Sequence, residues 1–179
     1  MRAARLALSV LLGVTGGPAA AESLRAPVFL VRHAERDGAG NDPSDPGLSP
    51  LGRERALSLA RVLGSVGLAR VLSTDYRRTR ETAGPVAAAL GLEIELYDPE
   101  DLPGLAERLL GEAGPTLVVG HSNTTGEVAA LLGGDPGPPF DEAADYDRLY
   151  VVTPGRDGPT TLLLRYGPQT GEAVEITPR

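Results

Sequence analysis

Both histidines of this 179-residue chain stand directly beyond a short apolar run. His33 has Arg32 before it, and His121 follows a second run and a glycine, while Arg78 lies just past a third run that ends in Ser-Thr-Asp. Two imidazoles and several guanidinium groups that meet in one crevice would bind an anion, and a phosphoryl group fits them best. A neutral imidazole nitrogen can attack phosphorus and form a covalent phosphohistidine, which water then hydrolyses.

Other kinds of site fit this set of residues less well. The histidines could be metal ligands, but arginines in the same crevice would repel a cation, so we expect no metal and no other cofactor. A serine hydrolase is disfavoured because the chain has no G-x-S-x-G motif. The absence of cysteine excludes thiol nucleophiles and disulfides. With 17 Lys+Arg against 24 Asp+Glu, a nucleic-acid partner is not expected.

Alternating strand and helix patterns are expected to position these residues. Four short apolar runs predict strands at 27–31, 71–72, 94–96 and 116–119. Helical spacing of apolar residues predicts helices at 53–63, with Ser49 and Pro50 opening the first, and at 76–90, 102–110 and 124–132. The alternation predicts a three-layer α/β fold, a mostly parallel sheet with helices on both faces. Two later strands, 149–152 and 161–166, are expected to form an antiparallel edge hairpin.

Ligands in open α/β sheets bind beyond the carboxyl ends of the strands. Both histidines and Arg78 follow such ends, so the predicted fold would bring them to one crevice. Two Gly/Pro-rich segments, 37–46 and 133–139, are expected to border it. The rings of Phe140, Tyr146 and Tyr150 fit either core packing or an interface.

The first 21 residues have the pattern of a secretory signal peptide. Arg2 and Arg5 precede the apolar run Leu6–Val14, and small residues end at Ala21. The run is shorter than the roughly 20 residues that a membrane-spanning helix needs. We therefore expect cleavage near Ala21, one domain over residues 22–179 with no membrane span in the mature chain, and a periplasmic or secreted location in a bacterium.

Three segments resemble the signature segments of the histidine phosphatase superfamily, which has the phosphoglycerate-mutase-like fold. They are LVRHAER (Leu30–Arg36), STDYRRTRETA (Ser73–Ala83) and VVGHSN (Val118–Asn123), and LSPLGRERA (Leu48–Ala56) resembles the opening of the family's first helix. The resemblance extends over about residues 27–152 and points to the compact branch of the family. It implies a phosphatase that hydrolyses phosphomonoesters or phosphohistidine without a metal, by way of a covalent phosphohistidine.

The resemblance assigns a role to each matching residue. His33 matches the nucleophilic histidine, and Arg32 matches its phosphate-binding partner. Arg78 matches the phosphate-binding arginine of the second segment. His121 matches the second histidine, which binds the phosphoryl group and stabilises the transition state.

Some neighbouring residues are expected to have lesser roles. Asn123 is a candidate for ordering the loop after His121, and Glu35 for a position at the pocket rim or in a salt bridge. Arg77 and Arg80 fit a solvated helix face.

The chain departs from the family in the general acid that protonates the leaving group. Asp98, Glu100 and Asp101 are candidates, but none of them aligns with the family's acid. The same cluster also fits a helix N-terminus, where carboxylates are favoured by the helix dipole. A member without the acid would prefer good leaving groups, such as phosphohistidine or an acyl phosphate.

Two other functions stay open at this point. A phosphoglycerate-type phosphomutase is disfavoured because the short chain lacks the long insertions that would enclose a substrate for phosphoryl return. A non-catalytic module that binds a phosphorylated ligand is the other alternative. The expected partner is a phosphorylated small molecule or a phosphoprotein, and the sequence leaves the individual substrate and the oligomeric state open.

Overall fold

A computed structural model describes residues 23–38 and 42–169 of the chain. The predicted signal peptide, residues 1–21, lies outside the described residues. The expectation of cleavage near Ala21 therefore stays a prediction.

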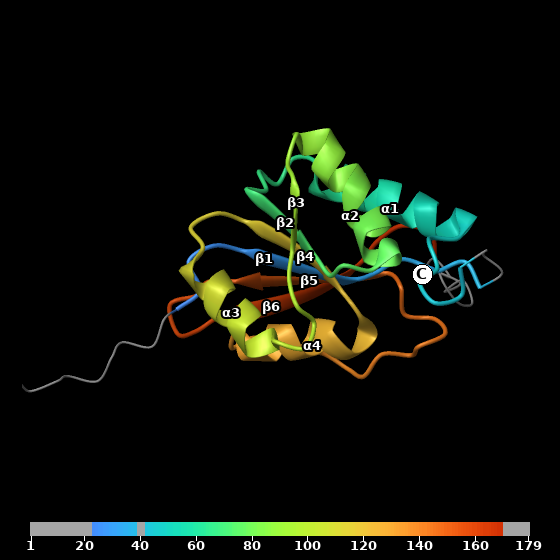
Figure 1. Cartoon of the computed structure of the whole chain (residues 1–179). Helices are drawn as coiled ribbons and strands as arrows, with labels where there is room; N and C mark the ends of the chain where they lie inside the picture. The colour runs from blue at the N-terminus through green and yellow to red at the C-terminus, as the bar shows by residue number, and fades with distance from the viewer. Residues whose placement is uncertain (1–22, 39–41, 170–179) are drawn as a thin grey trace, which may run out of the picture.

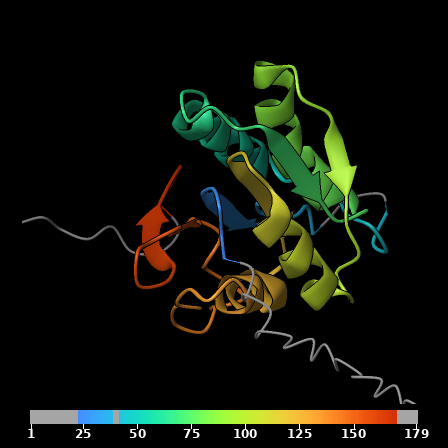
Figure 2. The same ribbon diagram turned by 90° about the vertical axis from the view of Figure 1, so that its left-hand side faces the viewer.

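The described residues contain a six-stranded sheet in the order β3-β2-β4-β1-β5-β6, with β3 and β6 at opposite edges (Figure 2). Its strands are β1 (Val28–Arg32), β2 (Arg70–Ser73), β3 (Ile94–Leu96), β4 (Thr116–Gly120), β5 (Arg148–Thr153) and β6 (Thr160–Arg165). The pairs β1–β4, β4–β2 and β2–β3 are parallel. Strand β5 is antiparallel to both β1 and β6. The predicted parallel sheet with an antiparallel hairpin at its edge is confirmed.

Two pairs of helices cover the two faces of this sheet (Figure 1). They are α1 (Pro50–Leu63), α2 (Arg77–Leu90), α3 (Leu102–Gly111) and α4 (Ser122–Leu131). Alternate residues of β1 point to opposite faces of the sheet. Phe29 and Val31 pack with α1 and α2 on one face, whereas Val28 and Leu30 pack with α3 and α4 on the other. The expected three-layer α/β architecture is therefore correct. No helix in the described part of the chain is both long and apolar enough to cross a membrane.

The helix ends lie within one residue of the prediction, except at the start of α4. Ser49 caps α1, where its hydroxyl accepts the Gly52 N–H at 3.0 Å, and Gly91 ends α2 with a left-handed φ of 66°. Helix α4 begins at Ser122, two residues before the predicted start. Its first turn is polar, so apolar spacing alone did not reveal it.

Helix α1 approaches the loop after β1 very closely. The Ser49 N–H donates to the Glu35 carbonyl at 2.9 Å. A Cβ atom on Gly52 would lie 2.2 Å from that carbonyl oxygen, which is part of the backbone and cannot rotate away. Glycine at this position therefore allows the helix to pack against the segment that carries His33.

We expect Gly52→Ala to lower the free energy of unfolding by about 1–3 kcal/mol, because the added methyl group forces α1 away from the loop. Gly111→Ala, at the end of α3, is the matched control, since a Cβ there meets nothing within 4 Å. It should leave stability unchanged or raise it by up to about 1 kcal/mol. Urea unfolding followed by circular dichroism measures both. Equal stabilities for the two variants would contradict the close approach of α1.

Candidate active site

The pairing of β1 with β4 brings the two histidines together. Arg32 and Gly120 are partners in the parallel register, so His33 and His121 are the next residues beyond the same edge. The pairing extends one step further, because the His33 N–H donates to the Gly120 carbonyl at 2.8 Å. The centroids of the two imidazole rings lie 5.5 Å apart at an interplanar angle of 68°.

Both rings line a cavity of about 450 Å³ at the carboxyl ends of the parallel strands. Its wall contains Arg32, His33, Arg36, Tyr76, Arg78, Pro99, Glu100, His121, Ser122, Asn123, Thr124, Glu142 and Tyr146. The four residues with predicted catalytic or phosphate-binding roles are thus gathered in one place, together with Asn123. The first residues of α4 also line the cavity, where free backbone N–H groups favour an anion.

The His33 ring is held with one nitrogen available for attack. Its Nδ1 atom lies 2.8 Å from the Ala34 carbonyl oxygen. A carbonyl only accepts, so Nδ1 carries the proton and the lone pair lies on Nε2. Desolvation lowers the pKa of His33 to about 3 against the opposing hydrogen bond to Ala34, and the positive charges of Arg78 and Arg32 act in the same direction as desolvation. The ring is therefore neutral at pH 7.

The His121 ring is fixed by a chain of hydroxyl groups. Its Nε2 atom lies 3.1 Å from the Thr74 hydroxyl, which is itself 2.9 Å from the Thr79 hydroxyl. The backbone N–H of His121 donates to the Thr124 hydroxyl at 2.9 Å, at the first turn of α4. Burial lowers the pKa of His121 to about 4, and the charge of Arg78 adds to the effect.

The Arg32 guanidinium is almost fully buried, and one of its three nitrogen atoms makes no hydrogen bond among the described residues. It donates to the carbonyl oxygens of Asp145 and Glu142 and, at 2.9 Å, to the Glu142 carboxylate. Its Nε atom is buried and makes no hydrogen bond among the described residues. A buried donor without a partner is rare in folded proteins, and a ligand oxygen in the cavity would satisfy it.

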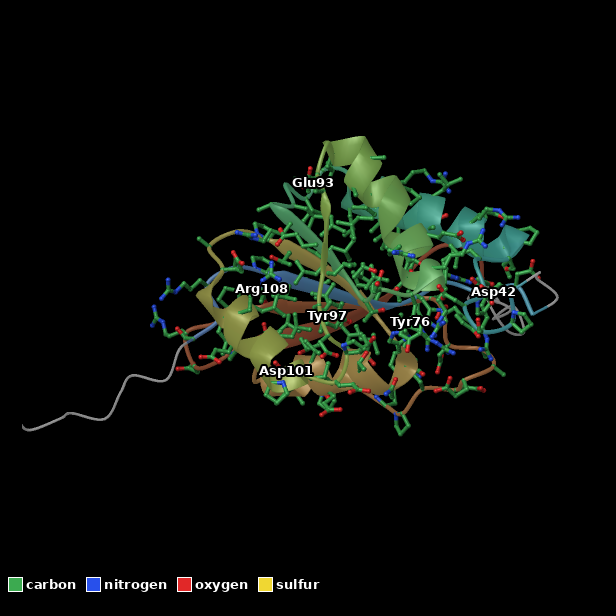
Figure 3. The ribbon with its side chains drawn as sticks, viewed as in Figure 1. Asp42, Tyr76, Glu93, Tyr97, Asp101 and Arg108 are labelled. Carbon is green, nitrogen blue, oxygen red and sulfur yellow. The ribbon has the colours of Figure 1, made fainter. Side chains whose placement is uncertain are left out.

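Two tyrosines that the sequence analysis did not assign to the site connect the arginines to the histidines. The Arg32 Cζ atom lies 4.0 Å from the Tyr146 ring centroid, and the Tyr146 and His33 ring centroids are 6.2 Å apart. On the other side, Arg78 lies 4.3 Å from the Tyr76 centroid, and Tyr76 meets the His121 ring edge-on at 5.2 Å. Figure 3 shows Tyr76 beside the start of α2. These stacked pairs hold both guanidinium groups at the cavity wall.

Of the site residues that the sequence analysis did not predict, one lies in a recognisable motif and two do not. Tyr76 belongs to the second signature segment, so its place at the site could have been inferred. Glu142 and Tyr146 lie in the loop before β5, which carries no motif, and only the fold brings that loop to the cavity. No described residue of segment 37–46 or of segment 133–139 is part of the cavity wall, which takes its residues from further along the second of these loops.

Other predicted residues have separate structural contacts. Glu35 pairs with the fully buried Arg55 at 2.7 Å and is absent from the cavity wall, so it supports the loop from outside. The pairs Arg77–Glu81 and Arg80–Asp75 lie on the exposed face of α2, as expected for a solvated helix surface; the remaining basic residue of this turn, Arg78, faces the cavity.

The three acidic candidates also separate. Asp101 caps α3, accepting the Gly104 N–H at 2.9 Å, and it lies at the helix start in Figure 3. Asp98 accepts the Glu100 N–H at 2.9 Å within the same turn. Glu100 is the member of the three that lines the cavity. In residues 23–38 and 42–169, no three His, Cys, Asp or Glu side chains are grouped in a way that could hold a metal ion.

A family model matches the part of the chain that carries Arg32, His33 and Arg78, and it ends before His121. The model of the histidine phosphatase superfamily (branch 1) matches residues 28–116. The chain belongs to the histidine phosphatase superfamily. The members to which it is similar include both phosphatases and a mutase, so membership alone does not choose between hydrolysis and transfer.

The chain is similar to a curated relative in sequence and to solved structures in fold. It is 38% identical over 78 residues to the probable phosphoglycerate mutase GpmB of Escherichia fergusonii, a match that spans 40% of the chain and only 35% of the relative. The protein histidine phosphatase SixA with tungstate shares the fold at a TM-score of 0.61 and 20% identity, covering 79% and 96% of the two chains. Mycobacterial glucosyl-3-phosphoglycerate phosphatase with VO3 gives 0.58 and 17%, covering 76% and 96%.

We expect both histidines of this superfamily member to stay neutral at pH 5.5, because their lowered pKa values lie near 3 and 4. Nitrogen NMR of the imidazoles measures this directly, and His33→Gln assigns the two signals. An unfolded histidine takes up a proton near pH 6.5, so the folded protein should lose stability as the pH falls below that value. Titration of either ring near pH 6.5 would contradict its burial.

Proposed function

We propose that the chain is a metal-independent phosphatase that hydrolyses phosphomonoesters or phosphohistidine through a covalent phosphohistidine at His33. The observation that carries the proposal is the state of this ring. A neutral imidazole with its proton held on Nδ1 by the Ala34 carbonyl has Nε2 free as a nucleophile, and it faces a cavity lined with arginines.

The cavity groups suit both halves of such a reaction. Arg32, Arg78 and the first N–H groups of α4 would bind the phosphoryl oxygens, and His121 would donate to one of them as charge develops. The His33 Nε2 atom attacks phosphorus, and the bond to the leaving oxygen breaks with its electron pair on that oxygen. Water then attacks the phosphohistidine, the P–N bond breaks, and orthophosphate leaves.

We assign the protonation of the leaving group to Glu100. Asp98 and Asp101 are engaged in hydrogen bonds within the turn that begins α3, whereas Glu100 lines the cavity and its carboxylate has no hydrogen-bond partner among the described residues. As general acid, the Glu100 carboxyl group would supply the proton that an alkoxide leaving group needs.

A phosphoglycerate-type phosphomutase is the second candidate, and the similarity to GpmB favours it. A mutase returns the phosphoryl group from the histidine to a second position of the substrate, whereas a phosphatase gives it to water. Transfer between 2- and 3-phosphoglycerate separates the two. A module that binds phosphate without turnover would show neither activity.

The location and partners belong to the same proposal. The leader pattern in residues 1–21 supports export to the periplasm or out of a bacterial cell. The substrate would be a phosphorylated small molecule or a phosphoprotein that is present there.

His33→Ala should lower the hydrolysis of p-nitrophenyl phosphate at least about a thousandfold, because it removes the atom that accepts the phosphoryl group. The wild-type rate should be the same with and without a chelator. Full activity of the variant would exclude the phosphohistidine intermediate. Wild-type hydrolysis that stops when chelator is added would refute the metal-independent mechanism.

Two neighbouring arginines provide the matched control for the anion pocket. Arg78→Ala should lower kcat/KM by about a hundredfold or more, since it removes a partner of the transferring group. Arg77→Ala removes the same charge from the exposed face of α2 and should leave kcat/KM within about twofold. Equal losses in the two variants would show that the effect is one of net charge.

We expect Glu100→Gln to discriminate between leaving groups. Hydrolysis of an alkyl phosphate should fall about a hundredfold, because its alkoxide needs a proton. Hydrolysis of p-nitrophenyl phosphate should change less than about threefold, since its phenolate leaves unaided. Kinetics on the two substrates test this, and Asp98→Asn serves as a control. The same loss on both substrates would assign Glu100 to binding and not to acid catalysis.

A further inference from the structure

The contacts of the Arg32 guanidinium are incomplete in a specific way. Its Nη1 atom donates to the Asp145 carbonyl at 3.4 Å, and its Nη2 atom donates to the Glu142 carbonyl at 3.1 Å and to the Glu142 Oε2 atom at 2.9 Å. Both protons of Nη2 are therefore engaged, whereas the Nε proton is buried without a partner. The Glu142 carboxylate thus accepts a hydrogen bond from Arg32, the arginine that is expected to bind phosphate.

This arrangement restricts how a phosphoryl group can bind. An arginine holds a phosphoryl group most strongly through two parallel N–H bonds, one from Nε and one from Nη2. The Nε proton is free, but Nη2 has no proton left while Glu142 is in place. Two-point binding at Arg32 therefore requires the Glu142 carboxylate to leave.

The two partners of this ion pair differ greatly in exposure. The Arg32 side chain is 5% exposed and the Glu142 side chain is 71% exposed. Two backbone carbonyls and the Tyr146 ring would still hold the guanidinium after the carboxylate left. Arg32 is the only hydrogen-bond partner of the Glu142 carboxylate within residues 23–38 and 42–169. The carboxylate can thus turn into water without leaving another group unpaired.

We propose that Glu142 is an exchangeable counter-ion of the phosphoryl site. Its carboxylate neutralises Arg32 in the free protein, gives way to the phosphoryl group of the substrate, and returns to Arg32 as orthophosphate departs. The inference rests on the proposed function, because it requires Arg32 to bind the phosphoryl group. Its effect is to weaken the binding of substrate and product alike, which limits inhibition by orthophosphate.

The test is the affinity of purified protein for orthophosphate, measured by calorimetry, together with inhibition of turnover by orthophosphate and vanadate. Glu142→Gln keeps the shape of the side chain but removes its charge, so it should bind orthophosphate about tenfold more tightly. The KM for p-nitrophenyl phosphate should fall in parallel. Glu142→Ala should show the same gain, which separates the lost charge from any new contact of the amide.

Glu127→Gln is the matched control. Glu127 is exposed on α4 and is absent from the cavity wall, so its removal changes the net charge equally without freeing Arg32. Orthophosphate affinity should stay within about twofold in this variant. Thermal unfolding of all three variants checks that the fold is intact.

The outcomes separate this inference from the proposed function. Unchanged or weaker orthophosphate binding in both Glu142 variants, with the wild type active, would overturn the inference alone and make Glu142 a residue that positions Arg32. An equal gain in Glu127→Gln would also overturn it, since net charge would then explain the effect. Absence of orthophosphate binding in every protein would overturn the anion pocket, and with it both proposals.

Discussion

The parallel pairing of β1 with β4 is the constraint on which the rest of the site depends. Its register sets Arg32 against Gly120, so both strands end at one level and each is followed by a histidine. A Cβ atom on Gly120 would lie 2.7 Å from the Tyr97 hydroxyl and 2.8 Å from that of Thr124, so the strand must end in glycine for these side chains to pack there. A shift of the register by one residue would turn one of the histidines away from the other.

Burial gives the site its chemical character. Two imidazoles that are taken out of water beside guanidinium groups cannot hold protons at pH 7, so they remain neutral as a nucleophile requires. Carbonyl oxygens and the Glu142 carboxylate surround the Arg32 guanidinium, and a tyrosine ring lies against each of Arg32 and Arg78. The arginines in the cavity wall thus favour an anion over a cation as ligand. The Arg32 Nε atom in this cavity wall is buried and has no hydrogen-bond partner among the described residues.

The elements of the fold were largely predictable, because each has a local signal. The apolar run before His33 became β1, Ser49 with Pro50 opened α1, and Gly91 ended α2. The start of α4 was misplaced because its polar first turn has no apolar spacing. The choice among Asp98, Glu100 and Asp101 could not be made from sequence. Within one turn of chain, the first and last carboxylates accept backbone N–H groups while the middle one lines the cavity.

The sequence by itself determined the α/β architecture and predicted four of the residues that line the cavity, because apolar spacing and signature segments are local properties of the chain. Only the tertiary structure decided that Glu142 and Tyr146 would join them. These residues lie more than a hundred positions after Arg32 and in a loop without a motif. Their place depends on β5 pairing beside β1, and a long-range contact of this kind leaves no periodic signal in the sequence.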